Sequence, residues 1–189
     1  MKEIIWFGRG GQGAVVAAQI LAESAYLEGF KGVTSAPTFG PERRGAPVTA
    51  STRISEEPIR MFSQVEMADI AVVLDETLLG VVDVKGRIRK GGTVIINTSC
   101  NPGDVGINGD FDVATVDATG IALKLRLMKE GAPLINTPML GAFAKATGIV
   151  SLGNVEKALR SKLPAAAASQ NFDTVRAAYE GTIVQKSQG

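Results

Sequence analysis

Residues 4–13 read IIWFGRGGQG, and residues 14–27 continue as AVVAAQILAESAYL. The run 4–7 is continuously apolar and is bounded by glycine, which is typical of a strand buried on both faces of a sheet. Residues 14–27 carry apolar side chains at helical spacing, and Gly29 is a typical stop signal. The stretch therefore predicts a strand, a glycine-rich turn and a helix, as at the start of an α/β domain.

The remaining sequence continues this alternation. Strands are predicted at 33–36, 48–54, 70–74, 93–97 and 112–116, with 58–62 as a second hairpin arm beside 48–54. Helices are predicted at 76–84, 118–130, 138–147, 151–162 and 171–183. This order indicates a parallel sheet with right-handed crossovers. We expect one α/β domain over 1–189. It should be Rossmann-like, a mostly parallel sheet flanked by helices, with a hairpin insertion and a helical C-terminal region at about 138–189.

The composition excludes several kinds of chemistry. The 189 residues include one cysteine, Cys100, and no histidine. Iron–sulfur ligation by four thiolates, Cys/His zinc sites and Ser-His-Asp or Cys-His catalysis are therefore excluded within this chain. A net charge of +1 gives no general attraction to nucleic acid or to anionic membranes. No apolar run approaches the ~20 residues of a membrane span, and residues 1–7 predict a strand and not a signal peptide, so we expect a cytoplasmic protein.

A glycine pattern follows the first predicted strand. Its residues, Gly8, Arg9, Gly10, Gly11, Gln12 and Gly13, fit G-x-G-x-x-G between a strand and a helix. In that context glycines permit a tight turn and let backbone N–H groups approach an anion. A dinucleotide site also needs an acidic residue about 20 positions on, and residues 29–40 contain none. The pattern therefore favours an anion site other than NAD, with close strand–helix packing as the alternative.

A second loop candidate is FGPERRGAP at residues 39–47. Its prolines fix two φ angles, so the loop is predicted to be rigid. It should present Arg43 and Arg44 near the carboxyl edge of the sheet, where ligands bind in doubly wound folds. The alternative is a solvated charged turn in which Glu42 pairs with an arginine.

The adjacent acids Asp75 and Glu76 follow a predicted strand. They resemble a metal or acid–base pair, but acids at this position usually cap the following turn. We therefore predict capping. No catalytic residue and no metal ligand is predicted anywhere in the chain.

Four segments carry a family resemblance when they are read in order. They are GRGGQGAVVAAQILAESA (8–25), FGPERRGAPVTASTRIS (39–55), ADIAVVLDETLL (68–79) and NTPMLGAFAKATGIV (136–150). Together they resemble the gamma subunit, or the equivalent fused domain, of pyruvate and related 2-oxoacid:ferredoxin oxidoreductases, over about residues 3–160. The form FGPERRGAPV looks like the pyruvate branch, since the 2-oxoglutarate branch more often reads like YGPEARGG.

The resemblance implies a subunit that is not active alone. The whole enzyme would convert pyruvate, coenzyme A and oxidised ferredoxin to acetyl-CoA, CO2 and reduced ferredoxin. Thiamine diphosphate, magnesium and iron–sulfur clusters would belong to alpha, beta and delta-type partner subunits, and ferredoxin would be reached through the complex.

In this chain, residues 8–13 would take the diphosphate of coenzyme A, a co-substrate. Arg43 or Arg44 would meet phosphate or a neighbouring subunit. The same role in a 2-oxoisovalerate or 2-oxoglutarate enzyme, an assembly module without a ligand, and a standalone NAD(P) enzyme remain alternatives.

Overall fold

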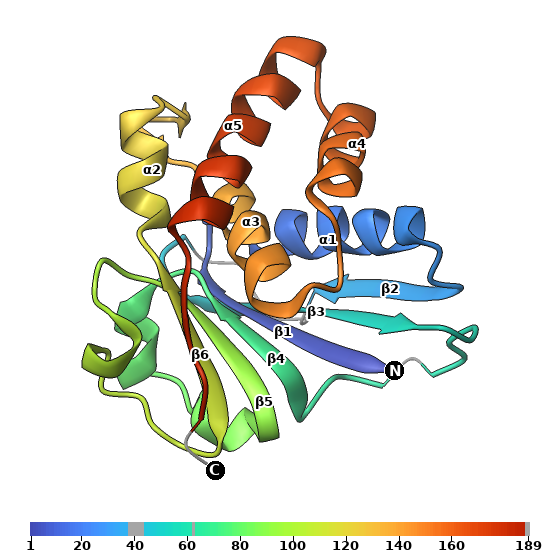
Figure 1. The fold of residues 1–189 in the computed structure, drawn as a ribbon, viewed down its shortest axis with the longest axis vertical. Coiled ribbons are helices and arrows are strands. Elements are labelled where there is room, and N and C mark those ends of the chain that lie inside the picture. The colour runs from blue at the N-terminus through green and yellow to red at the C-terminus, as the bar shows by residue number, and fades with distance from the viewer. Residues whose placement is uncertain (38–43, 62, 188–189) are drawn as a thin grey trace.

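A seven-stranded sheet forms the centre of the computed structural model, which describes residues 1–37, 44–61 and 63–187. The strand order is β2-β3-β1-β4-β5-β6-β9. The strands are β1 (Lys2–Arg9), β2 (Gly32–Pro37), β3 (Pro47–Ser55), β4 (Ala68–Val73), β5 (Ile88–Asn97), β6 (Phe111–Val116) and β9 (Ile183–Gln185). Strands β1, β4, β5 and β6 are parallel, whereas β3 is antiparallel to both β1 and β2, and β9 is antiparallel to β6 (Figure 1). The mostly parallel α/β sheet is as predicted.

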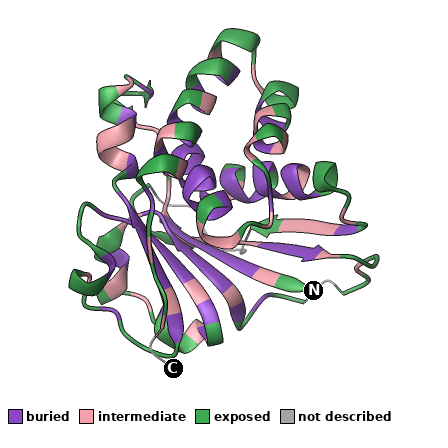
Figure 2. Cartoon of the chain, in the orientation of Figure 1, coloured by how far each residue is buried: buried purple, intermediate pink, exposed green. Residues whose placement is uncertain are grey.

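The two faces of the sheet carry different layers. Helices gather on one face, and their bounds are α1 (Ala14–Glu28), α2 (Ala118–Lys124), α3 (Asn136–Thr147), α4 (Leu152–Lys162) and α5 (Ala165–Gly181) (Figure 1). The other face is covered by loops and short 3-10 turns, η1 (Glu76–Gly80), η2 (Lys85–Arg87) and η3 (Pro102–Asp104). Buried side chains accordingly form two clusters, one on each face of the sheet (Figure 2). Among the described residues, no helix is both long enough and apolar enough to cross a membrane.

Strand β1 contributes to both clusters because successive side chains point to opposite faces. Ile4 and Trp6 pack with the helices, while Ile5 and Phe7 pack with the turns of the other face. The indole of Trp6 stacks on Phe143 of α3 with ring centroids 6.2 Å apart. The continuous apolar run at 4–7 is therefore explained by burial on both sides.

The hairpin prediction is wrong in one of its arms. Residues 58–61 form no strand, and Phe62 lies outside the described residues. Strand β3 instead pairs with β2, the segment predicted at 33–36, along six residue pairs. Because β1 occupies its other edge, β3 has no free edge left for residues 58–61.

Several helix predictions also need correction. The helix predicted at 76–84 is the short turn η1, and the one predicted at 118–130 ends at Lys124. A small hairpin follows it, β7 (Met128–Lys129) and β8 (Ala132–Pro133), with positive φ at Glu130 and Gly131 as a tight I′-type turn requires. The last helix is α5, 165–181 instead of 171–183, and strand β9 after it was not predicted.

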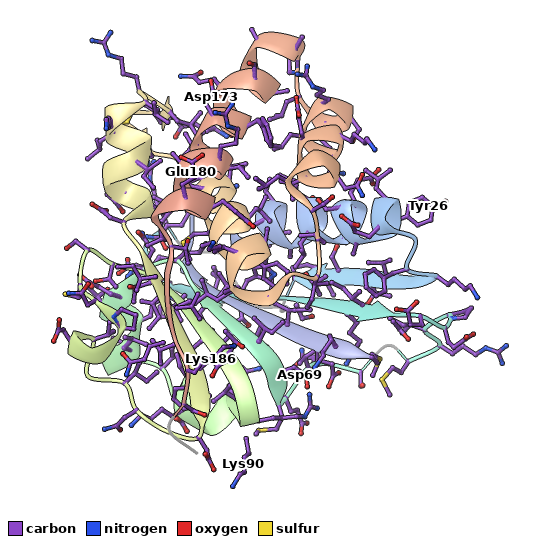
Figure 3. The ribbon with its side chains drawn as sticks, viewed as in Figure 1. Tyr26, Asp69, Lys90, Asp173, Glu180 and Lys186 are labelled. Carbon is purple, nitrogen blue, oxygen red and sulfur yellow. The ribbon has the colours of Figure 1, made fainter. Side chains whose placement is uncertain are left out.

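An ion-pair network joins the strands at their amino ends. The carboxylate of Glu3 accepts hydrogen bonds from Arg53 Nε at 2.8 Å and from Arg89 Nη2 at 2.6 Å. Arg89, near the start of β5, also pairs with Asp69, near the start of β4, at 3.2 Å (Figure 3 labels Asp69). Burial alone raises the pKa of Glu3, but hydrogen bonds and charges from Arg89 and Arg53 outweigh it and hold this pKa below its usual range.

We expect Glu3→Gln to lower the free energy of unfolding of the purified chain by about 2 kcal/mol at neutral pH, because two charged hydrogen bonds are weakened. The folded-state pKa of Glu3 is lowered, so its stabilisation is present above the unfolded-state pKa and is lost as pH falls. The difference from the natural chain should therefore stay constant from about pH 7 to about pH 5 and shrink as the pH falls further in urea titrations.

The matched control is Glu180→Gln, at an exposed carboxylate on α5 (Figure 3). Its stability should stay within about 0.5 kcal/mol of the natural chain. Equal effects of the two substitutions, or no dependence on pH for Glu3→Gln, would contradict the role given to Glu3.

Candidate functional site

A cavity of about 510 Å³ opens at the carboxyl ends of the parallel strands. Such edges are where doubly wound sheets bind ligands, because loops after neighbouring strands meet there. Its lining residues come from the glycine loop, the ends of β4, β5 and β6, and the β7–β8 hairpin. They are Gly10, Gly11, Gln12, Arg44, Leu74, Asp75, Glu76, Thr77, Asn97, Thr98, Ser99, Asp117, Thr119, Ala132, Pro133 and Ile135.

The glycine loop is the strand–turn–helix connection that the sequence predicts. It begins at Gly8, where an added Cβ would lie 3.1 Å from Leu74 Cδ1, and it leads into α1 through Gly13. Gly13 has φ +82°, and α1 has no side-chain cap at its N-terminus. Among the described residues, none accepts a hydrogen bond from the backbone N–H of Gly11 or of Gly13. The loop thus packs closely against the neighbouring strand, as the packing interpretation requires. It also has backbone N–H groups that can donate to an anion, as the anion-site interpretation requires.

The glycine loop and the arginine loop are joined by their backbones. The N–H of Gly10 donates to Ala46 O at 2.9 Å, and the N–H of Gly45 donates to Gly10 O at 3.1 Å. This places Arg44 beside the glycine loop, as the sequence analysis expected. Arg43 lies outside the described residues.

Arg9 does not face the cavity as a free cation. Its Nε donates to Asp75 Oδ2 at 3.1 Å, and its two Nη atoms donate to Gly45 O and Thr77 Oγ1. Gln12 is bound to the same group, since its Nε2 donates to Asp75 Oδ2 at 3.0 Å. The guanidinium is therefore hydrogen-bonded to neighbouring protein groups.

Asp75 caps the turn η1, as predicted for an acid at this position. Its Oδ1 accepts from the backbone N–H of Thr77 at 3.0 Å and from Thr77 Oγ1 at 2.5 Å. Burial raises the pKa of Asp75, but the hydrogen bonds from Thr77 and Gln12 and the charge of Arg9 outweigh it and hold this pKa below its usual range. The group is therefore an ionised acceptor at neutral pH.

A smaller groove of about 330 Å³ shares lining residues with the cavity and extends past Arg44. It runs between the glycine loop and the β7–β8 hairpin, which adds Lys129, Glu130 and Leu134 to the lining. Arg44 pairs with Glu130 at 3.8 Å, and both side chains are largely exposed. Such an exposed pair contributes little stability, so Arg44 remains available to a ligand.

Charge is divided between the two hollows. Among the described residues, the inner cavity is lined by the carboxylates of Glu76, Asp117 and Asp75, the last paired with Arg9, and by one cation, Arg44. The outer groove adds Lys129 beside Arg44 and, in the same part of the chain, one acid, Glu130. An anionic group is therefore favoured in the outer groove and opposed in the inner cavity.

Sequence reasoning missed the residues that follow β5 and β6. The buried amide of Asn97 donates to Leu74 O at 2.9 Å and to Thr119 Oγ1 at 3.0 Å, and it accepts from the backbone N–H of Thr119. Asp117 caps α2 through Gly120 N–H at 2.7 Å. Both Asn97 and Asp117 lie at the carboxyl end of a predicted strand. A polar residue at that position is the feature of the sequence that could have indicated a site residue.

The described residues contain no group of three or more aspartate, glutamate, cysteine or histidine side chains arranged to hold a metal ion. Cys100 is exposed on the loop after β5. These residues fit neither an iron–sulfur cluster nor a zinc site, because such sites need several thiolate or imidazole ligands.

The chain matches one protein family along most of its length. The model for the family "Pyruvate ferredoxin/flavodoxin oxidoreductase" covers residues 3–181. The "Pyruvate/ketoisovalerate oxidoreductases common subunit gamma" of Thermococcus litoralis is 48% identical over 187 residues, which is 97% of this chain and 98% of that protein. The "Pyruvate synthase subunit PorC" of Methanothermobacter thermautotrophicus is 48% identical over 180 residues, which is 95% of each chain.

A solved structure shows the same fold. The crystal structure of pyruvate oxidoreductase subunit PORC from Thermotoga maritima matches with a TM-score of 0.80 and 37% sequence identity. The match covers 98% of this chain and 100% of that one. The similarity therefore extends over the whole length of both proteins.

We expect Gly13→Ala to lower the free energy of unfolding by about 1–3 kcal/mol, because φ +82° is strained for alanine. The new Cβ would also lie 2.7 Å from Asn136 Nδ2. Urea unfolding of the purified chain measures the effect. Gly153→Ala on α4 is the control, since nothing lies within 4 Å of its Cβ position, and it should not destabilise the chain. Equal losses in the two variants would contradict the constraint at Gly13.

Proposed function

Since this chain belongs to the pyruvate ferredoxin/flavodoxin oxidoreductase family as a gamma-type subunit, we propose that it helps to bind coenzyme A in an enzyme that oxidises pyruvate. The enzyme would convert pyruvate, coenzyme A and oxidised ferredoxin to acetyl-CoA, CO2 and reduced ferredoxin. The observation that carries the proposal is the continuous hollow at the carboxyl edge of the sheet, bordered by the glycine loop and Arg44.

The division of charge sets the orientation of the ligand. The phosphates of coenzyme A would lie in the outer groove, near Arg44, Lys129 and the N–H of Gly11. Charge-assisted hydrogen bonds to phosphate favour this end. The uncharged arm with its thiol would extend into the inner cavity, where hydroxyl groups of Thr98 and Thr119 can meet its amides. The acids of the inner cavity oppose the reverse orientation, because phosphate and carboxylate repel each other.

The oxidation itself needs groups that this chain does not fit. With one cysteine and no histidine, it has no ligand set for iron–sulfur clusters. As the family resemblance implies, thiamine diphosphate, magnesium and the clusters would belong to alpha, beta and delta-type partner subunits, with ferredoxin as the electron acceptor. The contribution of this chain is to bind and orient coenzyme A at their boundary.

Pyruvate is the proposed oxoacid because the names of both sequence relatives include it. The Thermococcus protein is also named for ketoisovalerate and is described as a common subunit. A subunit that binds coenzyme A suits enzymes for either oxoacid, because coenzyme A is the same in both reactions. Selectivity for the oxoacid would then reside on the partners.

We expect Arg44→Glu in the assembled enzyme to raise the KM for coenzyme A about tenfold or more, since one charge-assisted phosphate contact is replaced by repulsion. The KM for pyruvate should not change. Steady-state kinetics with each substrate varied in turn makes the measurement. Arg176→Glu, on an exposed position of α5 that lines neither hollow, is the matched control.

If Arg44→Glu leaves the KM for coenzyme A unchanged in an intact complex, the phosphate site is not in this groove. If the substitution instead prevents the subunits from assembling while Arg176→Glu does not, the groove is a subunit interface and the ligand-free assembly role replaces the proposal.

A further inference from the structure

We infer that Asp75 is the positioning residue of this site, holding the glycine loop in its ligand-binding form through Arg9 and Gln12. This inference rests on the proposed function, since the ligand it concerns is coenzyme A. It assigns to Asp75 a role beyond capping η1, and it places Arg9 in the support of the site instead of in contact with the ligand.

The two oxygens of the carboxylate have separate partners. Among the described residues, Oδ1 accepts from Thr77 alone, through its backbone N–H and its hydroxyl. Within the same described ranges, Oδ2 accepts only from the glycine loop, from Arg9 Nε at 3.1 Å and Gln12 Nε2 at 3.0 Å. Oδ1 therefore caps η1, while Oδ2 accepts hydrogen bonds from the glycine loop that borders the cavity.

The hydrogen bonds of Arg9 and Gln12 connect Asp75 to two segments that line the groove, the glycine loop and the segment that carries Arg44. Gln12 accepts from the backbone N–H of Arg9 at 2.7 Å, which closes the turn between the strand end and α1. Arg9 also donates to Gly45 O at 3.1 Å, directly beside Arg44. One carboxylate thus fixes the glycine loop, which presents the N–H of Gly11, and the segment that presents Arg44.

The surroundings make these bonds stronger than a surface ion pair. The side chains of Arg9 and Asp75 are only 27% and 20% exposed. Hydrogen bonds to charged groups at such partly buried positions hold geometry better than bonds between solvated ends. Without Asp75, the Arg9 guanidinium would lose its counter-charge, and the turn at Gln12 would lose its anchor.

The test is Asp75→Asn in the assembled enzyme. Asparagine is a good cap and still offers one oxygen to Thr77, but its amide cannot accept from Arg9 and Gln12 together. We expect the KM for coenzyme A to rise about tenfold, because misplacing binding groups by a fraction of an ångström is costly. The KM for pyruvate should not change, and the melting temperature of the complex should fall by no more than about 4 °C. Asp173→Asn, an exposed acid on α5, is the matched control (Figure 3).

A double-mutant cycle separates positioning from a general structural effect. Gln12→Leu alone should raise the KM for coenzyme A, and adding it to Asp75→Asn should give less than the product of the two single effects, because both remove the same contact. Multiplicative effects, or an unchanged KM in both single variants, would overturn the inference. If Asp75→Asn lowers the melting temperature further, the coupling measured in the cycle decides the question, and not the single effect of Gln12→Leu, because Gln12 itself lines the cavity.

The outcome with Arg44→Glu distinguishes this inference from the proposed function. A raised KM for coenzyme A in Arg44→Glu with no change in Asp75→Asn and Gln12→Leu rejects the positioning role and keeps the phosphate site. A raised KM only in Asp75→Asn and Gln12→Leu keeps the positioning role and rejects the phosphate site at Arg44. No change in any variant rejects both.

Discussion

Strand β1 has no face open to solvent, and this burial determines the position of everything at its carboxyl end. Ile4 and Trp6 are covered by helices, while Ile5 and Phe7 are covered by the turns of the opposite layer. Close packing on both sides leaves the strand little freedom to shift or rotate. The turn that leaves it at Gly8 must therefore emerge at one place, against Leu74 at the end of the neighbouring strand.

Because the turn after β1 has a fixed position, it brings together two charged residues that are far apart in the sequence. Arg9 and Asp75 are separated by 66 residues, yet they meet because β1 and β4 are adjacent and parallel. The pair is neutral as a unit, so it organises the loop without adding net charge to the cavity. The charge that a ligand meets comes from Glu76 and Asp117 in the inner cavity and chiefly from Arg44 and Lys129 in the outer groove.

The local features of the fold were predictable from the sequence, while features that depend on distant partners were not. The apolar run at 4–7 and the pattern of 14–27 specify their own elements, and both are found. The pairing of β3 with β2 depends on which edge of β3 is left unpaired by β1, and the local sequence does not indicate this. The first arm of the hairpin, residues 128 and 129, was included in the helix predicted at 118–130, because the hairpin turn, Glu130 and Gly131, is only two residues long.

The site divides in the same way. The position of the glycine loop and of Arg44 at the carboxyl edge of the sheet was predictable, because the glycines and prolines that shape these loops are visible in the sequence. The commitment of Arg9 to Asp75 was not, since it follows from the contact between two strands. Asn97 carried a weaker signal, a polar residue at a strand end, and its value appears only when its amide is seen to join β4 and β5 to α2.

The positions of the two described ends determine whether a polypeptide fused to this subunit would cover the cavity. Residue 2 begins β1, and Lys186 pairs with Asp112 at the start of β6, so both described ends lie at the amino edge of the parallel strands (Figure 1). The hollow is at the carboxyl edge. A purification tag, or another polypeptide joined genetically at either end, would therefore leave the mouth of the hollow unobstructed, and the domain is suited to exist as a separate subunit or within a longer chain.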